Sequence, residues 1–213
     1  MVGEDPQLRR LLRAIVAGDY DGTAALLASS PDLATARAEG GATRQAAREW
    51  FLEEIRHYVY KGDTALHVAA AAHRPETVRL LITAGADVGA RNRRGAQPMH
   101  YAADGGPGSP YWDPGAQAAT VACLVEAGAD PNGVDKGGVT PLHRAVRNRC
   151  AAAVQALLDG GADPLRPNGS GSTPMQLARW TTGRGGSGSV EAKAQQEEIV
   201  RLLEQRGDGR ERV

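Results

Sequence analysis

The sequence has 213 residues, and its 25 lysines and arginines are balanced by 25 aspartates and glutamates. A chain of zero net charge lacks the positive field with which general nucleic-acid binders and electrostatic membrane binders attract phosphate groups. No apolar stretch approaches the length of a membrane span, and the first residues, M-V-G-E-D-P, lack the basic and apolar regions of a signal peptide. We therefore expect a cytoplasmic protein that binds neither nucleic acid nor membranes.

The chain begins with two predicted helices in residues 6–37, joined by a segment, A-G-D-Y-D, that is typical of a turn. The first helix carries one apolar stripe, and a second stripe begins in the following helix. The residues of these stripes are Leu8, Leu11, Leu12 and Ile15, and then Ala25, Leu26 and Leu27.

Residues 38–60 follow as a separate segment. Gly40 and Gly41 are expected to interrupt regular secondary structure, and Thr43 can cap a helix that follows. Apolar residues then recur at spacings of 3, 4 and 7, which predicts an added amphipathic helix. Its apolar face comprises Ala47, Trp50, Phe51, Ile55, Tyr58 and Val59. The segment holds four of the nine aromatic residues of the chain, which are Trp50, Phe51, Tyr58 and Tyr60.

The rest of the chain repeats one pattern. The segments T-A-L-H, Q-P-M-H, T-P-L-H and T-P-M-Q begin at Thr64, Gln97, Thr140 and Thr173, so their starts are 33, 43 and 33 residues apart. Each of the first three copies later closes with G-A-D. The copy at 140–163 has the pattern of two short helices joined by a turn. Because neither helix can bury the other's apolar stripe completely, the unit must pack against neighbouring copies to be stable.

A 33-residue period with T-x-L-H and G-A-D motifs resembles the ankyrin repeat. The resemblance covers about residues 6–207 and implies an all-α solenoid of helix-turn-helix repeats with short β-hairpin-like fingers, to which the predicted amphipathic helix is added. It also implies a non-catalytic recognition module that binds a protein partner through its concave face. We expect a monomer, one domain over residues 1–213.

We place the boundaries of this domain by the motif positions. They are 6–37 for the N-terminal cap, 38–60 for the inserted helix, 61–92 for repeat 1, 93–132 for repeat 2 with an insertion at 104–115, 133–164 for repeat 3, and 165–207 for the C-terminal capping repeat with an insertion at 181–189. Three prolines and four glycines in 104–115 exclude a regular helix there.

The resemblance also predicts which residues line the concave groove. In ankyrin folds these are the residue after the motif histidine and those three and four places further on. That register selects Val68, Ala71, Tyr101, Asp104, Arg144, Arg147, Asn148, Leu177 and Trp180. Tyrosine, arginine and tryptophan are enriched in binding hot spots, although a merely solvated groove is an alternative.

The insertions suggest a second hypothesis. If they fold over the inner helices, the groove becomes a closed pocket for an anionic small molecule, bound by a carrier or by an atypical ankyrin-scaffold enzyme. The site residues of both hypotheses are Tyr58, Tyr60, Tyr101, Asp104, Tyr111, Trp112, Arg144, Arg147, Trp180 and Arg184. The Tyr111–Trp112 pair either faces solvent or pins its loop to the inner helices, and G-R-G-G-S-G-S at 183–189 is either a linker or an anion-binding loop.

The histidines and cysteines of the repeats are interpreted as structural residues. His67, His100 and His143 stand at one repeat position, where the family uses histidine to hydrogen-bond the loops of neighbouring repeats. We expect no metal, no cofactor and no catalytic residue, because C-x-x-C, H-E-x-x-H and G-x-S-x-G motifs are absent. Cys123 and Cys150 are expected to be buried free thiols, in keeping with a reducing cytoplasm.

Overall fold

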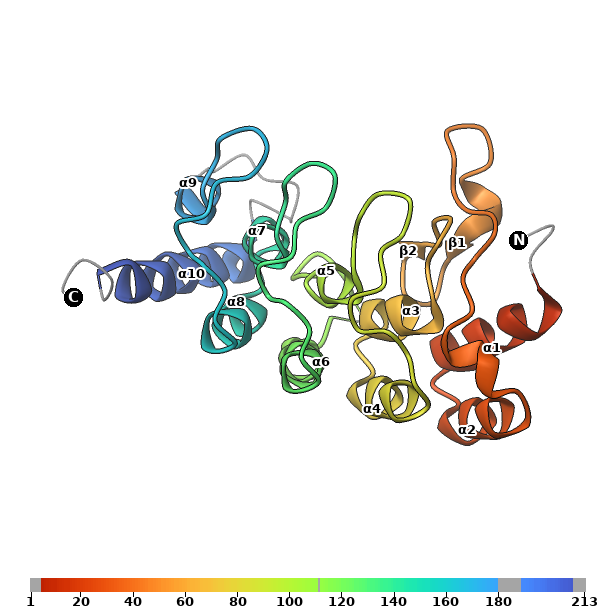
Figure 1. Cartoon of the computed structure of the whole chain (residues 1–213). Helices are drawn as coiled ribbons and strands as arrows, with labels where there is room; N and C mark the ends of the chain where they lie inside the picture. The colour runs from red at the N-terminus through yellow and green to blue at the C-terminus, as the bar shows by residue number, and fades with distance from the viewer. Residues whose placement is uncertain (1–4, 111, 180–188, 209–213) are drawn as a thin grey trace.

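A computed structural model describes residues 5–110, 112–179 and 189–208, and in these ranges the chain is a solenoid of paired helices (Figure 1). The all-α solenoid expected from the repeat period is confirmed. Its helices are α1 (Pro6–Ala17), α2 (Tyr20–Ser29), α3 (Ala65–Ala71), α4 (Pro75–Thr83), α5 (Pro98–Ala102), α6 (Pro114–Glu126), α7 (Pro141–Asn148), α8 (Ala151–Asp159), α9 (Pro174–Arg179) and α10 (Val190–Asp208). Short 3-10 turns occupy Pro31–Ala34 and Arg48–Trp50, and two strands are β1 (Phe51–Leu52) and β2 (His57–Tyr58).

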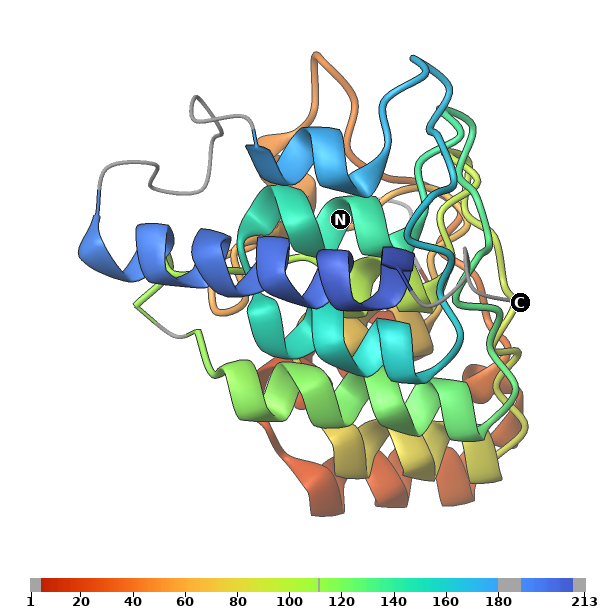
Figure 2. The ribbon, with the colours of Figure 1, turned by 90° about the vertical axis from the view of Figure 1, so that its left-hand side faces the viewer.

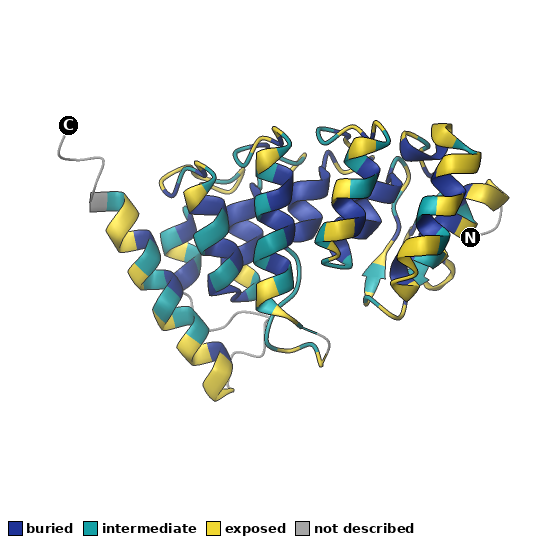
Figure 3. Ribbon diagram, turned by 90° about the horizontal axis from the view of Figure 1, so that it is seen from below, coloured by how far each residue is buried: buried dark blue, intermediate teal, exposed yellow. Residues whose placement is uncertain are grey.

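The helices form two layers. Odd-numbered helices pack against one another in an inner row, and even-numbered helices pack in an outer row. The loops that join one pair to the next, which we call fingers, all lie at the same end of the helices (Figure 2). The central inner helices α3, α5 and most of α7 are buried, whereas the end helices α1 and α9 and the outer helices each expose one side (Figure 3). Because each stripe is covered by the next repeat, the core is a continuous layer between the rows.

Each motif histidine joins two repeats. The Nδ1 atom of His67 accepts the backbone N–H of Thr64 at 3.1 Å, closing a capping box at the start of α3. Its Nε2 atom donates to the carbonyl of Ala96 in the next finger at 3.2 Å. His100 and His143 repeat the arrangement, donating to Val139 and Ser172 at 3.0 and 3.1 Å. The structural role predicted for these histidines is confirmed.

The fourth repeat carries Gln176 where the other repeats carry histidine. Its Oε1 atom accepts the N–H of Thr173 at 2.8 Å, so the local cap of α9 is preserved. Glutamine thus replaces the histidine Nδ1 atom as the capping acceptor, but it has no ring Nε2 atom of the kind that bonds the next finger in the other repeats.

The motif histidines make stability depend on pH. Burial lowers the pKa of all three, and that of His100 to about 4. The unfolded chain therefore binds more protons below the ordinary pKa of histidine, and the folded state loses stability as pH falls toward the folded pKa. Between about pH 7 and pH 5 we expect a loss of roughly 2 kcal/mol from His100 alone, measured by urea unfolding.

The control for this prediction is His100→Gln, which copies the residue of the fourth repeat. It should be less stable than the parent at neutral pH, yet lose less stability on acidification. An unfolding midpoint that is the same at both pH values would contradict the prediction.

The fingers are built from a recurring turn. The side-chain oxygen of Asp135 accepts the N–H groups of Gly137 and Val139 at 2.8 and 3.1 Å, and Gly138 adopts a φ of 68°. Asn92 and Asn168 form the same turn in the neighbouring fingers. Successive finger tips are joined by backbone hydrogen bonds, from Arg93 to Lys61 at 2.8 Å, from Lys136 to Arg94 at 2.9 Å and from Gly169 to Gly137 at 3.0 Å.

Close approach of two fingers requires glycine at position 138. A Cβ atom on Gly138 would lie 2.6 Å from the amide nitrogen of Gly169, in addition to the strain of its positive φ. Gly171 has the same kind of dihedral, φ 80°, but nothing within 4 Å of such a Cβ. We expect Gly171→Ala to cost about 1 kcal/mol and Gly138→Ala roughly twice as much, measured by urea unfolding. Equal losses would show that the contact has no energetic effect.

The prediction of an inserted helix in residues 38–60 is wrong. The segment forms a hairpin in which Phe51 pairs with Tyr58 and Leu52 pairs with His57, joined by a four-residue loop. Arg56 closes that loop with a φ of 50°, the left-handed conformation that reverses the chain. Trp50, Leu52 and Val59 are buried, and the rings of Phe51 and Tyr58 lie 4.7 Å apart as a cross-strand pair. A short apolar run of this kind is compatible with the helical period of 3.6 residues and with the strand period of two. Here the packing against the rest of the chain favours the strands.

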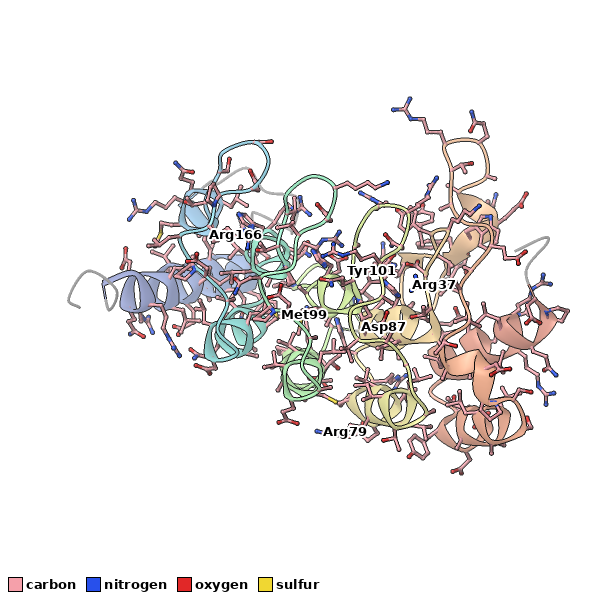
Figure 4. The ribbon with its side chains drawn as sticks, viewed as in Figure 1. Arg37, Arg79, Asp87, Met99, Tyr101 and Arg166 are labelled. Carbon is pink, nitrogen blue, oxygen red and sulfur yellow. The ribbon has the colours of Figure 1, made fainter. Side chains whose placement is uncertain are left out.

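Long-range hydrogen bonds fasten the whole segment to the solenoid. The N–H of Ala38 donates to the carbonyl of Asp63 at 2.7 Å, and Arg37 donates to the carbonyl of Arg91 at 3.0 Å. The Arg37 guanidinium also lies 3.8 Å from the carboxylate of Asp87 (Figure 4). The hairpin itself contacts the inner row through His57, whose ring lies against Tyr101 of α5 and near Asp104.

Candidate functional site

The concave side of the solenoid holds a groove of about 860 Å³ between the inner helices α5 and α7, the fingers and the hairpin. Three tyrosines line it, Tyr58, Tyr60 and Tyr101. Its carboxylates are Asp104 and Asp135, and its cations are Arg56, Arg93, Arg94, Lys136, Arg144 and Arg147. The insertion that forms the hairpin therefore supplies one wall of the groove, while two fingers supply the other.

Arg144 lies at the centre of the groove floor and engages both carboxylates. Its Nη1 atom is 2.9 Å from Asp104 and its Nη2 atom is 3.1 Å from Asp135, so the guanidinium bridges the end of α5 to a finger. Burial alone would raise the pKa of Asp104, but Arg144, with His57, holds it well below its usual range. The pKa of Asp135 is lowered as well, so both carboxylates are charged, and both are engaged by the single guanidinium of Arg144.

Tyr101 lines the floor of the groove beside this ion pair, as the register predicts, but it is buried rather than exposed. Only 2% of the residue is exposed, and its hydroxyl donates to the Asp63 carboxylate at 2.8 Å (Figure 4). The ring of His57, from the hairpin, covers it with centroids 4.5 Å apart. Burial, with the charge of Asp63, raises the pKa of the Tyr101 hydroxyl. The hairpin thus hides a residue that an unmodified repeat would present to solvent.

Val68 and Ala71 depart from the predicted concave register in the same way, since both are buried. Arg144 is also buried, with 8% of its surface exposed. Further along, Arg147 is exposed and Asn148 is partly exposed. The predicted register therefore holds best at the C-terminal end of α7.

Five cations rim the groove and remain exposed: Arg56, Arg93, Arg94, Lys136 and Arg147. Arg93 and Arg94 lie over the ring of Tyr60, at 5.5 and 4.9 Å from its centroid. Arg93 also donates to the carbonyl of Ala42. Among the residues that the structure describes, no carboxylate forms an ion pair with any of the five. The groove is basic although the chain as a whole is neutral.

Sequence reasoning missed four of these cations, Arg56, Arg93, Arg94 and Lys136. The signal for three of them is the finger turn itself. In N-R-R-G at 92–95 and D-K-G-G at 135–138, the one or two basic residues between the turn's Asn or Asp and its glycine line the groove. Arg56 could not be found, because the hairpin was predicted to be a helix.

The predicted site residues divide into three groups. The structure brings Tyr58, Tyr60, Tyr101, Asp104, Arg144 and Arg147 together around one groove. Trp112 instead lines a neighbouring pocket with His73. Tyr111, Trp180 and Arg184 lie outside the described residues, as does most of the insertion at 181–189.

Trp112 pins the loop between α5 and α6. It packs against the core, and its Nε1 atom donates to Gln117 at 2.9 Å. Gln117 in turn donates to the carbonyls of Ala102 and Asp104 at 3.0 and 3.1 Å. Since His73 also donates to the Asp104 carbonyl at 2.9 Å, the main chain at Asp104 is held from two sides. The loop thereby orients the carboxylate that Arg144 engages.

The described part of the chain offers neither a metal site nor a membrane-spanning helix. Residues 5–110, 112–179 and 189–208 contain no group of three His, Cys, Asp or Glu side chains arranged to hold a metal ion. No helix in these ranges combines the length and apolar character needed to cross a membrane.

The Arg144 bridge should be essential to stability because its removal leaves two carboxylates without a counter-charge. The side chains of Arg144 and Asp135 are 10% and 11% exposed. We expect Arg144→Met, which conserves volume, to destabilise the fold by about 3 kcal/mol in urea unfolding. The triple variant Arg144→Met, Asp104→Asn, Asp135→Asn should recover much of that loss, and a single-variant loss near zero would contradict the interpretation.

Comparison with known proteins places these features in context. A family model described as Ankyrin repeats (3 copies) matches residues 11–109, and one described as Ankyrin repeats (many copies) matches residues 124–178. Protein phosphatase 1 regulatory subunit 12A of Mus musculus is 44% identical over 64 residues, which are 28% of this chain and 6% of that protein. The Rattus norvegicus protein of the same name gives the same values. The chain thus spans a small part of the length of these relatives.

Proposed function

The chain belongs to the ankyrin-repeat family, and from that premise we propose that it is a non-catalytic recognition module that binds an acidic segment of a protein partner in its concave groove. The observation that carries this proposal is the unbalanced charge of the groove. Five exposed cations surround it, while both of its carboxylates are engaged by Arg144. An acidic segment would supply the missing negative charge, and complementarity of this kind gives specificity and fast association.

Two further features support a protein segment as the occupant. The groove is open along the solenoid, and it shares Arg94, Arg147 and Asn148 with a pocket toward α9. Tyr58 and Tyr60 add the amphipathic rings that are enriched in interface hot spots. The mouse and rat relatives are, by name, regulatory subunits of a protein phosphatase.

An anionic small molecule is the second candidate for the same groove. It is favoured by the meeting of two insertions above the floor, where His57 Nε2 lies 3.5 Å from Asp104 Oδ2. Such a ligand would contact Tyr58, Tyr60 and the exposed arginines. An enzyme on this scaffold would need an acid or base, and the Asp104 carboxylate is bound to Arg144.

The test is fluorescence anisotropy with a labelled oligoglutamate peptide, a neutral peptide of the same length and an oligolysine peptide. We expect only the acidic peptide to bind, with an affinity that falls as salt rises. Each of Arg56→Gln, Lys136→Gln and Arg147→Gln should weaken binding about threefold, and the triple variant more than about tenfold.

Arg79→Gln is the matched control, because Arg79 is exposed on the outer helix α4 (Figure 4). Equal weakening by this control, or equal binding of the neutral peptide, would refute the proposal. Stabilisation by small organic anions that depends on the same three groove cations, without peptide binding, would favour the second candidate.

We also infer a reducing compartment such as the cytoplasm. Cys123 and Cys150 are free and buried, and burial raises the pKa of both thiols. Unreactive thiols of this kind are typical of proteins that are not stabilised by disulfides.

A further inference from the structure

Arg149, directly after α7, is a buried cation without a counter-charge. Only 3% of the residue is exposed, and its Nη1 atom has no hydrogen-bond partner. None of the carboxylates in the described ranges pairs with it, and the segment 180–188 contains no aspartate or glutamate. Arginine is seldom buried in proteins unless it is paired.

The backbone at Arg149 adds to this anomaly. Its φ is 60°, in the left-handed region that favours glycine, and it forms the C-cap of α7. Glycine would close the helix without strain and without a buried charge. The backbone N–H of Arg149 bonds the carbonyls of Ala145 and Val146, so the dihedral serves the helix end, as it does at His73 after α3. The buried guanidinium has no such role, and it is this group that requires a partner.

A cavity of about 640 Å³ adjoins this residue, between α7, α9, α10 and the last finger. Three arginines line it, Arg94, Arg147 and Arg149, and no aspartate or glutamate is among its lining residues. Its apolar lining is Val139, Val146, Leu177 and Ile199. The cavity therefore combines concentrated positive charge with an apolar wall.

We propose that this cavity binds a small organic anion, in which a carboxylate or phosphate group pairs with Arg149 and an apolar portion lies against Leu177 and Ile199. Arg94 and Arg147, at the boundary with the basic groove, complete the anion's environment. The cavity adjoins the basic groove and shares these two arginines with it, but Arg149 lines the cavity alone and so distinguishes the two sites. Guanidinium groups suit both oxyanions, since they present paired donors.

The test measures the melting temperature of the full 213-residue chain. The probes are sodium hexanoate and sodium phosphate, and sodium chloride at equal ionic strength is the reference. Binding to the folded state should raise the melting temperature by about 2 °C or more at saturating probe. A rise with hexanoate alone assigns a carboxylate with an apolar tail, and a rise with phosphate assigns the phosphate group. Arg149→Gln should abolish the rise.

Arg166→Gln is the matched control, because Arg166 is exposed on the last finger and does not line the cavity (Figure 4). It should retain the full response to the probe. No rise in the parent protein, or an equal rise in Arg149→Gln, overturns the proposal. Should Arg149→Gln not fold, calorimetric titration of Arg147→Gln, whose side chain is exposed, should show affinity for the same probe reduced about threefold. Unchanged affinity in that variant also overturns it.

Binding of the oligoglutamate peptide to Arg149→Gln separates this proposal from the first one. We expect it to be unchanged, because the groove cations are retained. Loss of the probe response with retained peptide binding supports both sites. Peptide binding that fails in the parent while the probe response depends on Arg149 supports the anion site alone.

Discussion

The coupling of each repeat to the next by one imidazole is the interaction on which the rest of the structure depends. No single helix pair can bury its own apolar stripe, so the repeats must stack in a fixed register. His67, His100 and His143 set that register by capping their own helix and bonding the following finger. Because Nδ1 accepts a hydrogen bond while Nε2 donates one, the imidazole must be neutral, and burial, which lowers its pKa, keeps it so. The groove exists because these bonds hold the fingers at a constant distance from the inner helices.

The charge of the groove arises from how the stacking divides cations and carboxylates. Asp104 and Asp135 belong to different repeats, and Arg144 brings them together on the floor. The remaining cations lie on fingers, on the hairpin and, for Arg147, at the end of α7, and no carboxylate in the described part of the chain forms an ion pair with them. Positive charge is therefore concentrated at the groove although the whole sequence has zero net charge. The same principle operates at Arg149, where the absence of a nearby carboxylate is compounded by burial.

Much of the fold follows from the sequence because the repeat period is long and its motifs have a physical role. The helix pairs, the capping histidines and the position of the loop at 104–113 could all be predicted on that basis. The hairpin at 51–58 could not, since Trp50, Phe51, Tyr58 and Val59 satisfy a helical period as well as a two-sided strand pair. The site was predictable only in part. Arg147 lies on a helix whose exposed face is known, whereas Arg93 and Lys136 meet across fingers that are 43 residues apart in sequence.

The bonds of the motif histidines also explain where this chain tolerates extra residues. His67 and His143 bond a carbonyl 29 residues further on, while His100 reaches one 39 residues further on with an equally short distance. Ten additional residues between α5 and α6 have therefore left the stacking unaltered. The fingers after α4, α6 and α8 have no comparable insertion, and the main chain of each is hydrogen-bonded to the finger before it. Extra residues thus enter this solenoid at two kinds of place, between the two helices of a repeat and in the connection before α3, and in both cases they border the groove without displacing the stacked repeats.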